Sequence, residues 1–167
     1  MRNKLSLLVL ALMACGAANA APVGDVASVQ ASLTFAAQNT TNATWTQAPS
    51  LSSASSINLG DKLGTLNIQL TGSHSGVYVT AEGSDVTGGI VGVPFKDASG
   101  NAYLWGRTAN SNIPQLASVD MTGHNGPGWR LENAADNFDI DFVAFDNKDK
   151  VAPGQYTATF YIQQYQS

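Results

Sequence analysis

The stretch PGQYTATFYIQQYQS, residues 153–167, carries the pattern that decides the fold. Pro153 and Gly154 are turn residues, and apolar side chains follow them at every second position. A period of two is that of a β-strand, because successive side chains of a strand point to opposite faces. We therefore expect a last strand whose buried face carries Tyr156, Ala158, Phe160 and Ile162.

The same alternation recurs along the chain, whereas helical periodicity is hard to find. It is clearest in residues 29–35, with Val29, Ala31, Leu33 and Phe35 on one face. In NFDIDFVAF, residues 137–145, the pattern predicts aromatic residues inside and Asp139 and Asp141 in water. Further strands are expected at 38–49, 66–70, 77–81 and 129–131, and a hairpin at 90–107 around the turn 96–100.

Seven or eight short strands with turn signals between them predict an all-β sandwich of immunoglobulin-like type. The Ser-rich stretch 50–56 and the Gly- and Pro-punctuated stretch 109–128 are expected to be loops.

The first 20 residues have the composition of a signal peptide. Arg2 and Lys4 precede an apolar run, and Ala18-Asn19-Ala20 is a small-x-small triplet that suits a signal peptidase. An alternative is a lipoprotein cleavage box at 12–15, which would make Cys15 a lipidated terminus. No stretch approaches the roughly 20 apolar residues of a transmembrane helix.

Cleavage after Ala20 would leave 147 of the 167 residues, the size of one domain, and would remove the single cysteine. An exported protein with no disulfide and no thiol chemistry is then expected. Six basic and 12 acidic residues would remain, a net charge of about −6, so nucleic acid is not an expected partner. Uncharged polar residues dominate, which suits an extracellular β-protein better than a cytosolic enzyme.

Three groups of residues allow other interpretations. The carboxylates Asp136, Asp139, Asp141, Asp146 and Asp149 could suggest a calcium site, but their spacing matches no loop motif, and no metal or other cofactor is expected. His74 and His124 could belong to a hydrolytic triad, but no nucleophile turn accompanies them, so surface histidines are expected and no enzyme. Trp45, Trp105 and Trp129 could form a sugar-stacking platform, although such residues more often pack in the sandwich.

Five stretches resemble a known family: AAQNTTNATWTQ (36–47), LGDKLGTL (59–66), GGIVGVPF (88–95), GWR (128–130) and PGQYTATFYIQQYQS (153–167). They look like the major fimbrial subunits of the Salmonella SEF type and their relatives in enterotoxigenic Escherichia coli, which are chaperone-usher pilins. The likeness covers nearly the whole chain and is densest at its C-terminal end.

The resemblance implies an immunoglobulin-like sandwich that lacks its last strand and so has an open groove. A periplasmic chaperone would first lend a strand to this groove, and at an outer-membrane usher the N-terminal extension of another copy would replace it. Residues 1–20 would then be the signal peptide, 21–37 the donor-strand extension and 38–167 the pilin domain. The donor residues would be Val29, Ala31, Leu33 and Phe35, and Tyr156, Ala158, Phe160 and Ile162 would line the acceptor groove.

The product would be a linear homopolymer on the cell surface, with a tip adhesin and a host receptor as further partners. Many pilins have a disulfide and a penultimate tyrosine, whereas here the mature chain would have no cysteine and the penultimate residue is Gln166. The alternative is a secreted carbohydrate-binding sandwich that completes its own fold. Such a module has little need for the extra patterned strand at 29–35.

Overall fold

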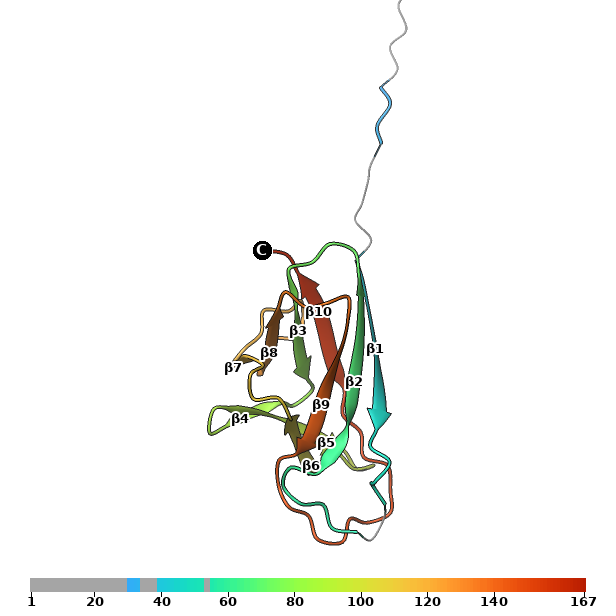
Figure 1. The fold of residues 1–167 in the computed structure, drawn as a ribbon, viewed down its shortest axis with the longest axis vertical. Coiled ribbons are helices and arrows are strands. Elements are labelled where there is room, and N and C mark those ends of the chain that lie inside the picture. Colours follow the sequence, from blue (N-terminus) through green and yellow to red (C-terminus); the bar gives the residue numbers. More distant parts are fainter. Residues whose placement is uncertain (1–29, 34–38, 53–54) are drawn as a thin grey trace, which may run out of the picture. The chain divides into compact units, whose positions relative to one another are not determined.

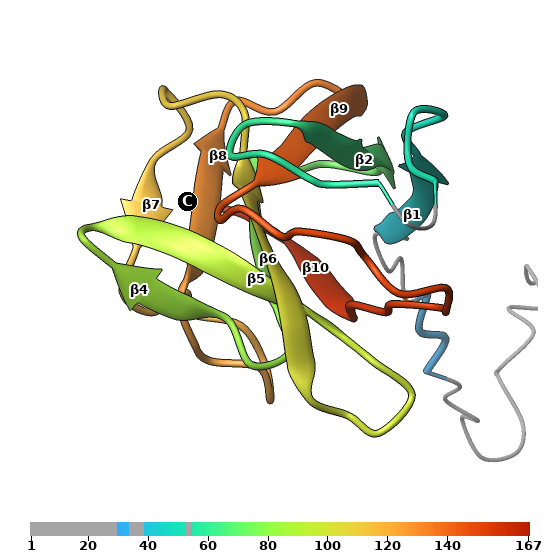
Figure 2. The ribbon, with the colours of Figure 1, turned by 90° about the horizontal axis from the view of Figure 1, so that it is seen from below.

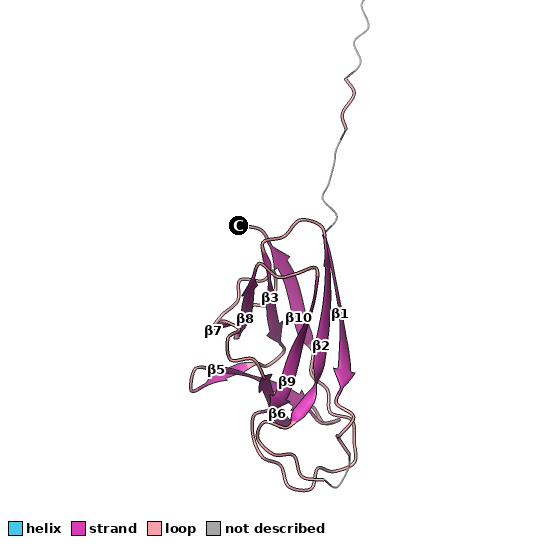
Figure 3. Cartoon of the chain, in the orientation of Figure 1, coloured by secondary structure: helices cyan, strands magenta, loops and turns pink. Residues whose placement is uncertain are grey.

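The computed structural model describes residues 30–33, 39–52 and 55–167. Contacts divide the chain into two units, Met1–Phe35 and Ala36–Ser167, and every strand of the described residues belongs to the second. The described residues form strands and loops without a helix (Figure 3). Within these ranges there is accordingly no helical segment with the length and apolarity that crossing a membrane requires.

The described part of the second unit contains ten strands joined by turns and loops. They are β1 (Thr40–Gln47), β2 (Lys62–Thr71), β3 (Gly76–Ala81), β4 (Asp85–Thr87), β5 (Ile90–Lys96), β6 (Ala102–Thr108), β7 (Gln115–Leu116), β8 (Gly128–Glu132), β9 (Asn137–Ala144) and β10 (Phe160–Tyr165).

These strands form two antiparallel sheets (Figures 1 and 2). The larger sheet has the order β1-β2-β9-β6-β5-β4, and the smaller has the order β10-β3-β8-β7. Strands that are neighbours in sequence are often separated in space, so the chain passes repeatedly between the sheets. The all-β sandwich predicted from the sequence is confirmed.

The core lies between the sheets and follows the predicted alternation. In β9, Ile140 and Phe142 are buried while Asp139 and Asp141 are exposed, as expected. Trp129 of β8 is fully buried and meets the Phe142 ring edge-on, with centroids 5.6 Å apart. The β2 and β3 side chains that complete the centre are Leu66, Ile68, Leu70, Val77 and Val79.

The predicted hairpin is present as β5 and β6. In its turn the Asp97 carboxylate accepts hydrogen bonds from the backbone N–H of Ser99 and Asn101, at 2.9 and 3.0 Å. Gly100 has φ of 83°, which glycine adopts without steric cost. The turn chemistry at 96–100 therefore has the role assigned to it from the sequence.

The last strand differs from the prediction, because it begins at Phe160 and not at Tyr156. Before it, Thr157 exchanges two backbone hydrogen bonds with Lys96 of β5, at 2.8 and 2.9 Å. The chain is thus held to the larger sheet at Thr157. It reaches the smaller sheet at Thr159, whose carbonyl accepts from the N–H of Glu82 at 2.9 Å, and pairs with β3 from Phe160 onward. Tyr156 and Ala158 keep their predicted face but lie outside the strand.

Short strands were also missed. β4 has no counterpart in the prediction, and β7 lies within the stretch 109–128 that was expected to be a loop. In contrast, the irregular strand expected at 38–49 is the regular β1, which pairs with β2 over all of its eight residues.

Candidate functional site: a groove between two sheet edges

β1 and β10 are edge strands of different sheets, and they lie side by side where the sandwich opens (Figure 2). β1 pairs only with β2, and β10 pairs only with β3. Within the described ranges no main-chain hydrogen bond joins β1 to β10. An unpaired edge presents free N–H and C=O groups to another strand. Two such edges therefore flank one opening.

Beside this opening lies a cavity of about 490 Å³, which we call the edge groove. One wall is formed by Trp45, Gln47, Leu51 and Ser52, from the end of β1 and the loop after it. The larger sheet and the stretch before it contribute Ile57, Leu63, Phe95, Tyr103 and Leu104. The third wall is the stretch Val151–Ala158 together with Phe160.

An aromatic cluster closes the inner end of the edge groove. Trp45 of β1 stacks on Phe160 of β10, with ring centroids 5.8 Å apart and planes 18° apart. Both rings also pack on Phe142 of the core, at 5.9 and 5.0 Å. The two edge strands thus contact each other through side chains that are continuous with the core, and these side chains remain only partly buried.

Tyr156 belongs to the third wall of the edge groove. Its ring stacks on Tyr103 with centroids 4.7 Å apart, and its hydroxyl donates to the carbonyl of Ala152 at 3.0 Å. Burial raises the pKa of Tyr156 above its ordinary value, and the neighbouring Tyr103 adds to the effect. The phenol therefore stays neutral and acts as a packing and hydrogen-bonding group.

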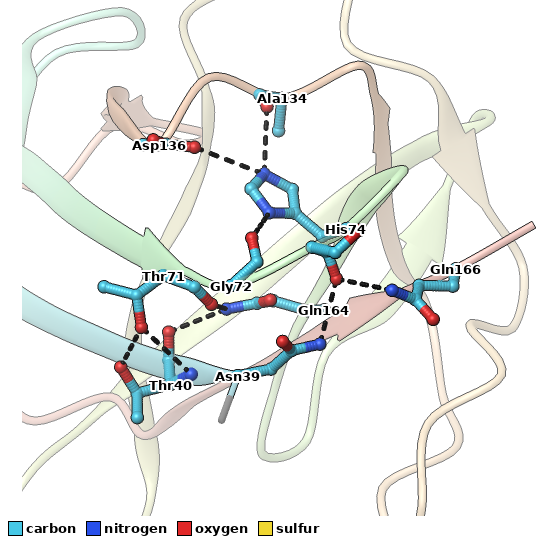
Figure 4. Close-up of polar contacts among 10 residues, drawn as sticks. Asn39, Thr40, Thr71, Gly72, His74, Ala134, Asp136, Gln164 and Gln166 are labelled. Carbon is cyan, nitrogen blue, oxygen red and sulfur yellow. Dashed lines mark hydrogen bonds and ion pairs between the residues drawn. The ribbon is translucent and has the colours of Figure 1, made fainter. Parts of the chain in front are cut away.

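The opposite end of the β1–β10 opening is closed by polar side chains (Figure 4). The Nε2 of Gln164, on β10, donates to the carbonyls of Thr40 and Thr71 at 2.7 and 3.2 Å. Next to it, Asn39 Nδ2 and Gln166 Nε2 both donate to the carbonyl of Ser73, at 2.9 and 2.7 Å. The loop between β2 and β3 therefore ties the start of β1 to the end of β10.

His74 anchors this same loop and is not the surface histidine that was expected. Its side chain is only 6% exposed. The ring nitrogens lie 3.2 Å from the carbonyl of Gly72 and 3.1 Å from that of Ala134 (Figure 4). The Gly- and Ser-rich sequence around His74 gave no sign that its side chain is buried. The burial depends on Ala134, which belongs to the β8–β9 loop, 60 residues further along the chain.

The predicted donor residues are only partly within the described chain. Val29 and Phe35 lie outside the described residues. Ala31 and Leu33 lie in the stretch 30–33, where both are exposed, Leu33 to 85%. Their assignment to a strand shared between copies stays a prediction.

The predicted groove residues share one side of the chain. Tyr156, Ala158 and Phe160 line the edge groove, and Ile162 follows on the same face of β10 and packs against the core. Sequence reasoning missed the facing wall, above all Trp45. Its strand, TTNATWTQ, shows little alternation because Thr and Asn occupy both faces.

The described residues that could suggest a sugar platform, a hydrolytic triad or a metal site do not come together in the structure. Trp129 is buried and Trp45 packs inward, so these two residues form no common exposed platform for a sugar. His124 stacks on Tyr161 on the outer side of β10, with centroids 3.6 Å apart, while His74 contacts other loops. The described residues include no group of three or more His, Cys, Asp or Glu placed to hold a metal.

Two carboxylates of the group that could suggest a calcium site have partners on β2. Asp139 accepts a hydrogen bond from Asn67 at 2.8 Å. Asp141 accepts one from Thr65 at 2.6 Å and pairs with Lys62 at 2.8 Å. Hydrogen bonds from Lys62 and then Thr65 hold the pKa of Asp141 below its ordinary value.

Comparison with solved structures identifies the fold. The minor tip subunit of the Escherichia coli Hda pilus matches with a TM-score of 0.57 and 19% identity, over 76% of this chain and 84% of that one. A structure of enteroaggregative Escherichia coli AAF fimbriae, described with their fibronectin binding and biofilm formation, matches with a TM-score of 0.56 and 18% identity. That match covers 77% of this chain and 87% of the other. At these identities the likeness concerns the immunoglobulin-like fold alone.

Sequence comparison identifies the family and confirms the resemblance noted above. The family model described as SEF14-like adhesin matches residues 2–167. A fimbrial protein of Salmonella enteritidis is 41% identical over 167 residues, which is 99% of both chains. Fimbrial subunits are structural and adhesive proteins of the cell surface and not a class of enzyme. The chain belongs to the SEF14-like adhesin family and is a fimbrial protein.

Proposed function

We propose that this chain is the major, repeating subunit of a cell-surface fimbria and polymerises by donor-strand exchange. The observation that carries the proposal is the pair of unpaired edges, β1 and β10, on either side of an aromatic groove. In this proposal residues 21–37 of one copy supply the strand that fills the opening in the next. Adding a strand to an exposed edge is β-augmentation, for which chaperone–pilin complementation is a standard example.

A subunit that repeats along a filament needs both a groove and a donor segment. The sequence supplies the second as Val29, Ala31, Leu33 and Phe35, an alternating row that a self-complete sandwich does not need. A subunit with both parts can accept from one neighbour and donate to another, and so can stand anywhere in a filament. This is why we favour a major subunit over a terminal one.

The burial of the donor row gives the junction its free energy. Burying a Val, Leu or Phe side chain is worth about 1.5–3 kcal/mol, so the row supplies roughly 5–9 kcal/mol before main-chain hydrogen bonds are added. The entropy lost on association reduces this sum. The remainder, together with the main-chain pairing, still favours a long-lived contact.

The proposal also assigns the assembly partners. A periplasmic chaperone occupies the groove after signal-peptide cleavage, because an open groove would otherwise expose apolar side chains and free edges. An outer-membrane usher then provides the place where one copy's segment replaces the chaperone. The other proposed partners are a tip adhesin and a host-surface receptor.

The test is to express the chain with its chaperone and usher, with and without residues 21–37. Full-length chains should give fibres by electron microscopy and ladders on gels that collapse on heating, and chains lacking 21–37 should give neither. Leu33→Asp should block fibres yet leave chaperone binding largely intact, because it alters the donor and not the groove. Thr34→Ser, on the opposite face of the segment, is the matched control. Normal fibres from Leu33→Asp would contradict the proposal.

A further inference from the structure

The apolar row on the groove side of the chain ends abruptly at Gln164. Counting along this face at every second residue, Tyr156, Ala158, Phe160 and Ile162 are apolar or aromatic, and Gln164 is the next. The predicted donor segment carries a row of the same length: Val29, Ala31, Leu33 and Phe35. For a given strand direction, two rows of four can match fully in only one alignment.

Gln164 also joins the two edges at this point. Its Nε2 reaches from β10 to the carbonyl of Thr40, where β1 begins, at 2.7 Å, and to that of Thr71 at 3.2 Å (Figure 4). A strand lying between β1 and β10 would have to break both hydrogen bonds to extend past this residue. The carboxamide therefore forms a barrier across the opening.

The other half of the same carboxamide lacks a partner. Gln164 Oε1 is shielded from solvent, and it accepts no hydrogen bond from any described residue. A buried acceptor without a donor is unfavourable, so the oxygen would gain from one N–H or O–H donor. An apolar side chain placed there would leave the oxygen unsatisfied, whereas the backbone N–H at the end of an incoming strand would satisfy it.

We propose that Gln164 sets the register of the incoming strand, acting as a polar stop at one end of the β1–β10 opening. The proposal rests on the donor-strand assembly described above, with residues 29–35 of a second copy as the occupant. In the matched alignment the four apolar residues cover the row from Tyr156 to Ile162. A shift by two residues toward Gln164 places an apolar side chain against the carboxamide, and a shift in either direction leaves one member of the row uncovered.

The register can be measured by disulfide trapping, since the only cysteine of the sequence is Cys15, within the predicted signal peptide. Thr44→Cys on β1 is combined in turn with Gln30→Cys, Ser32→Cys or Thr34→Cys, all expected on the outward face. Fimbriae assembled from each full-length double variant are analysed on non-reducing gels. A disulfide requires Cα atoms within about 7 Å, and a shift of two residues moves the segment by about that distance.

In the otherwise unchanged chain, one of the three pairs should form intersubunit disulfides about tenfold more than the others, the preference expected from roughly one or two hydrogen bonds. With Gln164→Leu the three yields should fall to within about threefold of one another. Gln166→Leu is the matched control, because Gln166 bonds Ser73 at the same end without spanning the opening. It should keep the single register.

An unchanged preference in Gln164→Leu fimbriae would overturn the proposal. Gln164→Met provides a second, unbranched replacement. If neither variant assembles while Gln166→Leu does, Gln164 is required for folding, and the proposal is also overturned. If fimbriae form but none of the three pairs cross-links even with Gln164 present, donor-strand assembly itself is contradicted, which separates the two failures.

Discussion

Gly64 decides whether Trp45 can reach the groove. It lies on β2 opposite Gln47, and the Trp45 indole crosses directly over its Cα. A Cβ at position 64 would stand 2.6 Å from the carbonyl oxygen of Thr46 and 2.7 Å from the indole Cε2. Neither atom can yield easily, since one is backbone and the other is wedged between Phe95 and Phe160.

Gly64→Ala is therefore expected to displace Trp45 and to damage the groove. Overpacking of this kind costs about 1–3 kcal/mol. We expect fewer fimbriae and a lower temperature of heat dissociation on gels. Gly126→Ala is the control, because its nearest neighbour would be the Thr80 hydroxyl at 3.9 Å. Equal losses in both variants would show that the effect is not specific to the groove.

At the scale of single elements, the ladder between β2 and β9 links charge to stability. Asp141 of β9 has its pKa lowered by hydrogen bonds from Lys62 and Thr65 on β2. Folding thus favours the ionised carboxylate. This contribution is fully present above the ordinary value of 3.8 and is lost as the pH falls through the lower, folded-state pKa.

Asp141→Asn should consequently lower the stability of the fimbria slightly at neutral pH and flatten its pH dependence below about pH 4. The side chain is 47% exposed, so the loss should be under about 1 kcal/mol. Heat dissociation measured from pH 2 to pH 7 checks this. Lys62→Met should flatten the profile in the same way. A profile as steep as that of the unchanged chain in both variants would contradict the assignment.

The elements that could be predicted are those whose own residues carry the pattern. Alternation located β9, and turn chemistry located the β5–β6 hairpin. The start of β10 could not be predicted, because Thr157 is held by Lys96, a contact between residues far apart in sequence. β4 and β7 were missed because they have only three and two residues.

For the same reason, only one wall of the edge groove could be predicted from the sequence. Tyr156, Ala158 and Phe160 stand in an alternating row, whereas Trp45 stands among Thr and Asn on a strand whose register against β10 depends on the whole sandwich. The Gln164 bridge likewise joins residues 124 positions apart. Only the packing of two sheets brings such residues together.

At the scale of the whole molecule, the proposed donor segment and the groove are different surfaces of one chain. Contacts between unlike surfaces are heterologous and need not close into a ring, so they generate an open filament. No further symmetry is required for a fibre to grow. The order of assembly is then set by which copies can donate and which can accept.

A copy that accepts but cannot donate should therefore stop growth. Co-expression of the full-length chain with one lacking residues 21–37 should shorten the fibres, with mean length falling as the proportion of the truncated copy rises. Electron microscopy gives the lengths, and an epitope tag on the truncated copy should be found only at fibre ends. Tagged copies along the shaft would show that the segment is dispensable for joining subunits.

The central claim is that the folded body is incomplete and that residues 21–37 of another copy complete it. The most direct measurement is thermal unfolding of the isolated body, residues 38–167, followed by circular dichroism with and without a synthetic peptide of residues 21–37. We predict aggregation or no cooperative transition for the body alone and a cooperative, stabilised transition with the peptide. A monomeric body that melts cooperatively at high temperature, with a midpoint the peptide does not change, would contradict the claim.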